Sequence, residues 1–158
     1  MLTPGIIQSR VKYVIQVMSI FKKKRLLGLC KPKRKEYFGI LDRDGLRYLT
    51  QLRVELNPLK YYKFNHNFAD THDPMCPSND GVESTEHFLL DCRLFLLPRN
   101  ALLNNVSLAI GTNIKDFSRN KITKILLYGD AAFKPDVNKR ILIETIRFIH
   151  ESKRFVTT

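Results

Sequence analysis

The stretch PDVNKRILIETIRFIHES, residues 135–152, decides the fold class of this chain. Its apolar side chains recur every three or four residues, which places them on one face of an α-helix. Pro135 and Asp136 suit the first turn of a helix. The spacing therefore predicts a helix over 136–152, whose inner stripe is Val137, Ile141, Glu144/Thr145, Phe148 and Ile149.

Helical patterns of the same kind lie on the N-terminal side of this stretch, and each carries boundary residues of its own. Asn57-Pro58 ends one helix, Ser84 or Thr85 caps a second, Pro98 opens a third that Gly111 ends, and Gly129 closes a fourth. The composition of 22–36 indicates a basic loop or arm, and that of 76–83 indicates a turn-rich loop. We expect 59–75 to be irregular, with room for one helical turn. No convincing alternating strand or internal repeat is found. We therefore predict a mainly α fold, a small helical domain, with helices over 4–20, 44–56, 84–97, 98–109, 119–128 and 136–152.

The size and composition of the chain limit its class. It has 158 residues, 44% of them hydrophobic, which is enough for one packed domain with an arm. No apolar run is long enough for a membrane helix, and three cysteines are too few for a disulfide-rich secreted scaffold. We expect a basic amphipathic helix and arm over 1–35 and a helical domain over 36–158, in an intracellular protein of the nucleus or cytoplasm.

Positive charge is concentrated near the N-terminus. Residues 1–63 carry 15 Lys or Arg and 4 Asp or Glu, whereas residues 64–158 carry 12 and 11. Such asymmetry is typical of contact with RNA or DNA, although a solvated basic segment or a nuclear-import patch would look the same. The candidate nucleic-acid-binding residues are Lys22, Lys23, Lys24, Arg25, Lys31, Lys33, Arg34, Lys35, Lys60 and Lys63.

Cys76, His87 and Cys92 form a candidate zinc site. A turn-rich loop that bears a Cys, followed by a helix that bears His and Cys, is how small zinc knuckles are built. On an ideal helix, however, residues five apart lie roughly 140° from each other, so the His must lie near the first turn or the helix must distort. A structural zinc takes four ligands, and the second Cys expected shortly after Cys76 is replaced by Ser78 and Asn79. Groups that would serve as the fourth ligand are Asp80, Asp73, His72 and His66.

The alternative is that the metal has been lost and that Cys92, facing Leu89 and Phe95, is core. Cys30 lies far from the site, in the basic arm, as a free thiol. No phosphate-binding loop, dinucleotide motif or His-Glu-x-x-His pattern is present, which argues against an enzyme. Asp42 and Asp44 have the spacing of a Mg²⁺ pair, but capping of a helix near Gly45 is the better interpretation.

Two segments, LRYLTQLRVELNPLKYYKFNHNFAD (46–70) and MCPSNDGVESTEHFLLDC (75–92), resemble the region behind the polymerase domain of non-LTR, LINE- and jockey-like retrotransposon reverse transcriptases. KILLYGD (124–130) and residues 136–155 extend the resemblance. It implies a Cys/His zinc-binding segment that helps to grip RNA or DNA, with Cys76, His87 and Cys92 at three ligand positions and the remaining Cys missing at Ser78 or Asn79. The polymerase and endonuclease motifs of that family do not occur here, so the chain resembles a severed C-terminal remnant.

We therefore expect a non-catalytic nucleic-acid-binding module, with no membrane or small-molecule partner. The aromatic residues Tyr61, Tyr62, Phe64 and Phe68 lie among cationic ones and would stack on bases, although Phe64 and Phe68 are expected in the core. Two other readings stay open. One is a decayed fragment with no selected activity. The other is a helical protein-interaction domain that uses the stripes at 7–18 and 137–149.

Overall fold

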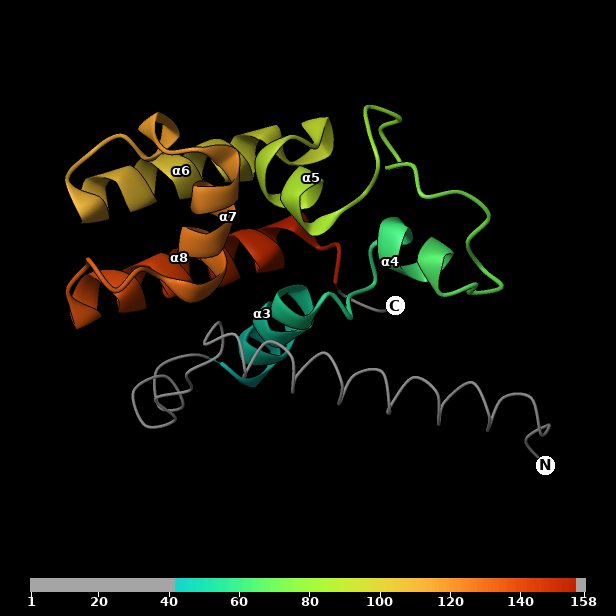
Figure 1. Cartoon of the computed structure of the whole chain (residues 1–158), viewed down its shortest axis with the longest axis horizontal. Helices are drawn as coiled ribbons and strands as arrows, with labels where there is room; N and C mark the ends of the chain where they lie inside the picture. Colours follow the sequence, from blue (N-terminus) through green and yellow to red (C-terminus); the bar gives the residue numbers. More distant parts are fainter. Residues whose placement is uncertain (1–41, 156–158) are drawn as a thin grey trace. The chain divides into compact units, whose positions relative to one another are not determined.

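Helices account for most of residues 42–155, the part of the chain that this computed structural model describes (Figure 1). Within these residues no strand forms, and Met75 and Val82 make an isolated antiparallel bridge. The predicted mainly α fold is confirmed. The elements are α3 (Arg43–Val54), α4 (Lys60–Asn65), α5 (Thr85–Leu90), η1 (Arg93–Phe95), α6 (Leu96–Ile110), η2 (Ile114–Asp116), α7 (Arg119–Tyr128) and α8 (Pro135–Ser152).

The predicted helix over 4–20, the basic runs at 22–25 and 31–35, and Cys30 lie outside the described residues. None of the helices between residues 42 and 155 combines the length and the apolar composition that crossing a membrane requires.

Most of the predicted helix boundaries are confirmed. Helix α7 covers the predicted residues 119–128, and α6 ends before Gly111, whose φ of 74° is left-handed. The interpretation of Asp42 as a cap is also confirmed, because its carboxylate accepts the backbone N–H of Gly45 at 2.6 Å. Local sequence signals thus place these helix ends without help from the rest of the fold.

The predicted helix over 84–97 is wrong, because the chain leaves the helix at Asp91 and Cys92. The guanidinium of Arg99 donates a hydrogen bond to the carbonyl of Cys92. The backbone N–H of Arg93 donates to a carboxylate oxygen of Asp80 at 2.9 Å. These backbone groups are therefore paired with side chains from α6 and from the preceding loop instead of with a continuing helix.

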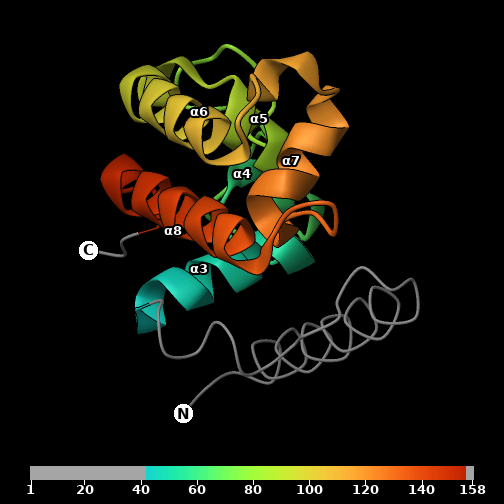
Figure 2. The ribbon, with the colours of Figure 1, turned by 90° about the vertical axis from the view of Figure 1, so that its left-hand side faces the viewer.

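Helix α8 packs against α3, α6 and α7 (Figures 1 and 2). Its inner stripe is core, since Ile141, Thr145, Phe148 and Ile149 are all buried. On the side of α3 the two helices touch directly: a Cβ on Gly45 would collide with a methyl group of Ile146. In the described structure the stripe at 137–149 is thus used for folding.

An aromatic cluster joins α5 to this core. The ring of Phe88 lies 5.1–5.5 Å from the rings of Phe95, Phe148 and Phe155, and Phe88 itself is fully buried. Such edge and tilted contacts add to the stabilisation that burial alone provides. Because Phe88 follows His87 in α5, the core fixes the position of one candidate metal ligand.

Candidate metal centre

A tight loop between α4 and α5 carries the first candidate ligand. The backbone N–H of Cys76 donates to the carbonyl of Gly81, and that of Asn79 donates to the carbonyl of Cys76, both at 2.8 Å. Asn79 adopts a left-handed φ of 55°, which this residue type tolerates. The turn predicted for 76–83 is confirmed, and it brings Cys76, Ser78 and Asp80 to one side.

Helix α5 supplies His87 and leads to Cys92. Ser84 is the N-cap, and its hydroxyl accepts the N–H of His87 at 3.1 Å, so His87 lies in the first turn. The helix ends before Cys92, whose N–H donates to the carbonyl of His87 at 2.9 Å. Both conditions for a shared site are therefore met: His87 lies in the first turn of α5, and the helix ends before Cys92.

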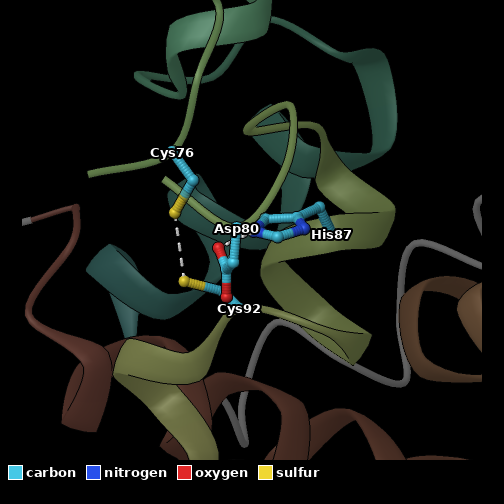
Figure 3. Close-up of side chains that lie close together, drawn as sticks. All are labelled: Cys76, Asp80, His87 and Cys92. Atoms are coloured by element: carbon cyan, nitrogen blue, oxygen red, sulfur yellow. Dashed lines mark hydrogen bonds and ion pairs between the residues drawn. The ribbon is translucent and has the colours of Figure 1, made fainter. Parts of the chain in front are cut away.

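The side chains of Cys76, Asp80, His87 and Cys92, hereafter the ligand cluster, converge (Figure 3). Their ligand atoms all lie within 4.8 Å of one another. The two Sγ atoms are 3.2 Å apart, and Nε2 of His87 is 3.2 Å from Oδ1 of Asp80. A tetrahedral zinc holds two thiolates about 3.8 Å apart, so small adjustments would accommodate the ion.

One atom in the ligand cluster is left without its usual partner. His87 is only 8% exposed, and its Nε2 has no hydrogen bond within the described part of the chain. Asp80 is near enough for an ion pair, but the contact lacks the geometry of a hydrogen bond. Buried polar atoms without partners are rare in folded proteins, and a metal ion would supply one here.

Ser78 and Asp80 share hydrogen bonds at the base of the ligand cluster. The Ser78 hydroxyl donates to Oδ1 of Asp80 and lies 3.1 Å from Sγ of Cys76. These bonds, from Ser78 first and the N–H of Arg93 second, hold the pKa of Asp80 well below its usual range, and His87 adds to the effect. Asp80 is therefore a carboxylate, the form that binds metal. Burial raises the pKa of the Cys76 thiol, which keeps it protonated until a cation displaces the proton.

The other groups considered as a fourth ligand lie elsewhere. The ring of His66 lies against Tyr62, with centroids 4.3 Å apart, and His72 is exposed. Asp73 accepts the N–H of Met75 and pairs with Lys60. Of the candidates, the fold brings Asp80 to Cys76, His87 and Cys92.

Two residues that support the ligand cluster were not predicted. A Cβ on Gly81 would lie 3.0 Å from the His87 ring, so the absence of a side chain lets the ring approach the loop. The carboxylate of buried Glu83 accepts hydrogen bonds from Nε and Nη2 of Arg154, at 2.6 and 2.8 Å. It also accepts one from the backbone N–H of Lys60, at 2.7 Å. The Asn-Asp-Gly turn was a signal for Gly81, whereas nothing local to Glu83 indicates a partner 71 residues away.

Helix α4 and the turn after it expose most of their aromatic side chains. Phe64 and Phe68 were expected in the core, but they are 40% and 39% exposed, and Tyr61 is exposed as well. Tyr62 takes the buried position, because it is the ring that faces the domain. Lys63 pairs with Asp70 at 2.6 Å, and Lys60 lies 3.5 Å from Asp73.

Comparisons of the chain with protein-family models, with curated proteins and with solved structures find no match. The chemistry of the site therefore rests on its own geometry. Two sulfurs, one imidazole nitrogen and one carboxylate oxygen, all within 4.8 Å of one another, suit Zn²⁺, which accepts all three donor types.

Proposed function

We propose that this chain is a non-catalytic nucleic-acid-binding module in which a zinc ion at the ligand cluster holds the loop between α4 and α5. It would correspond to the segment behind the polymerase domain of non-LTR retrotransposon reverse transcriptases. The observation that carries the proposal is the exposed surface of α4 and the turn after it, where Tyr61, Phe64 and Phe68 lie exposed in the same segment as Lys60 and Lys63.

Exposed rings beside ammonium groups are a means of holding single strands. Bases stack on aromatic faces, and lysines contact phosphates. Lys60 and Lys63 now pair with exposed aspartates, but such pairs contribute little free energy, so phosphate can replace the carboxylates. The basic runs at 22–25 and 31–35 would add most of the electrostatic attraction.

The zinc ion would supply structure, since it links the loop to α5 without taking part in any reaction. Glu83 connects the same loop to the N-terminus of α4 through the N–H of Lys60. A change at the ligand cluster would therefore reach the surface of α4 through a short, hydrogen-bonded path.

The test is the binding of the full chain to fluorescently labelled single-stranded RNA and DNA, followed by anisotropy. Tyr61→Ala and Phe64→Ala should each weaken binding by about 5- to 100-fold, the range of one base stack. Affinity should also fall steeply with added salt. Leu97→Ala and Leu108→Ala are matched controls, because these two side chains are exposed on α6. Binding that ignores both the α4 substitutions and salt would refute the proposal.

A second function, protein interaction, is favoured by an apolar surface on η1 and α6. Leu94, Leu96 and Leu97 are exposed together around the start of α6, and Leu108 is exposed about three turns further along the helix. Sedimentation of the full chain, with Leu97→Asp as the comparison, tests whether this surface mediates association.

A further inference from the structure

Arg99 lies in the first turns of α6, next to the ligand cluster, and is only 4% exposed. Its guanidinium donates to the carbonyl of Cys92. Among the residues that the structure describes, no carboxylate pairs with it, and its Nε has no hydrogen-bond partner. Burying an unpaired charge costs free energy, so Arg99 requires a compensating negative charge nearby.

The other cations around the site are either paired with a buried carboxylate or largely in solvent. Arg154 forms its two-pronged pair with buried Glu83. The side chain of Arg93 reaches Asp80 at 3.4 Å but is largely in solvent, where its charge is screened. Arg99 is thus the buried cation beside the ligand cluster that has no carboxylate partner among the described residues.

The negative charge that Arg99 lacks as a partner would be present in the ligand cluster once a metal ion is bound. With a divalent ion bound, the thiolates of Cys76 and Cys92 and the carboxylate of Asp80 carry three negative charges, and His87 is neutral. The loaded centre therefore has a net charge of minus one, in contrast to a neutral centre built from two Cys and two His.

We propose that Arg99 is the countercharge of the metal centre: its buried guanidinium neutralises the single negative charge of the loaded ligand cluster and so raises its affinity for the ion. This inference rests on the zinc centre of the proposed function. Arg99 contacts the backbone of one ligand and touches no ligand atom, so it acts as a positioning and charge-balancing residue.

The experiment measures zinc affinity of the full chain by competition with a chromophoric chelator. Arg99→Met should weaken zinc binding by about 10- to 100-fold, the usual effect of removing a group that supports a metal ligand. Arg99→Lys, which keeps the charge, should stay near wild type. Arg119→Met is the control, since it removes one positive charge from an exposed pair with Asp91. The absorption spectrum of the Co²⁺ form reports whether both thiolates still bind.

A charge effect is separated from a structural one by repeating Arg99→Met in an Asp80→His background. There the loaded centre is neutral, so the loss of Arg99 should change affinity by less than about threefold. An equal loss in both backgrounds, or wild-type affinity in a folded Arg99→Met protein, would overturn the inference. If Arg99→Met does not fold, Arg99→Gln against Arg99→Lys makes the same comparison. A wild-type chain that binds neither Zn²⁺ nor Co²⁺ would instead overturn the metal centre itself, and this role with it.

Discussion

The Sγ atoms of Cys76 and Cys92 lie 3.2 Å apart, both fully inside the domain, although 16 residues separate them in the chain. Besides remaining free thiols, two cysteines this close have two further fates: they bind one metal ion, or they join in a disulfide. The two fates exclude each other, because the sulfur atoms that bind the ion are those that would be oxidised.

We therefore predict that zinc protects these two thiols from oxidation. In a Cys30→Ser background, diamide should convert the metal-free chain to a form with no titratable thiol, while saturating zinc should preserve both. Thiol counting and the mass of the intact protein measure the result. Equal oxidation with and without zinc would contradict a site at these sulfurs, and Cys76→Ser is the control that cannot close the disulfide.

A second prediction concerns the fourth ligand. Asp80→Ala should weaken zinc binding by at least about tenfold, because a tetrahedral site loses one of its donors. Ser78→Cys should restore much of that affinity, since the Ser78 hydroxyl already lies 3.1 Å from Sγ of Cys76 and 3.6 Å from Sγ of Cys92. Asp73→Ala is the control, because Asp73 lies outside the ligand cluster. Chelator competition measures all three, and an unchanged affinity in Asp80→Ala would exclude Asp80 as a ligand.

A third prediction tests the close contact of Gly81 with His87. In Gly81→Ala the new Cβ would stand 3.0 Å from the imidazole ring and displace it by a few tenths of an ångström. Zinc affinity should fall about tenfold. Gly111→Ala is the control, because it should change stability and leave zinc binding alone. Its φ of 74° strains any other residue, so the free energy of unfolding should fall by about 1 kcal/mol, while the zinc affinity should stay unchanged. Loss of affinity in both variants would show that the metal site only follows overall stability.

The fourth prediction concerns stability and the pair formed by Glu83 and Arg154. Glu83→Gln should lower the free energy of unfolding by about 3 kcal/mol, because it leaves the guanidinium without its charge partner. The value is at the low end for buried pairs, since Arg154 keeps 27% of its side chain exposed. Glu86→Gln, in an exposed pair with Arg119, should cost less than about 1 kcal/mol. Urea unfolding measures both, and equal effects would mean that the first pair contributes no more than a surface one.

The fifth prediction concerns the stability that Asp42, the N-cap of α3, contributes at acid pH. The N–H of Gly45 lowers the pKa of Asp42, and nearby His150 adds to the effect. Because the pKa is lower in the folded state, this stabilisation is complete above the unfolded value of about 3.9 and is lost as the pH falls below it. Asp42→Ala should cost about 1 kcal/mol at pH 7. The difference from wild type should shrink below about pH 3. A cost independent of pH would assign it to packing.

The sequence predicted the parts of the fold that depend on local chemistry. Gly111, Gly129 and Pro135 mark helix ends because their backbone preferences act wherever they occur. The break at Cys92 could not be found in this way, since it depends on Arg99, which reaches back from the next helix. The same holds for the exposure of Phe64 and Phe68: whether a ring faces solvent depends on which neighbouring side chain, here Tyr62, takes the buried position.

The candidate metal site could also be predicted only in part, for the same reason. Residue types and spacing identified Cys76, His87 and Cys92, and they left Asp80 among several candidates. Choosing Asp80 required the loop geometry, because hydrogen bonds between Cys76, Asn79 and Gly81 decide which side chains turn inward. Arg99 and Glu83 carry no local signal at all, since their partners lie in other elements.

The hydroxyl of Ser78 has a consequence for how such a site evolves. Serine and cysteine differ by one atom, and this hydroxyl already lies beside both sulfurs and Asp80. In a zinc-loaded cluster of the proposed kind, a change of Ser78 to Cys would add a third sulfur before Asp80 is lost. The fourth ligand would then pass from oxygen to sulfur through two single substitutions, with at least four donors present at each step.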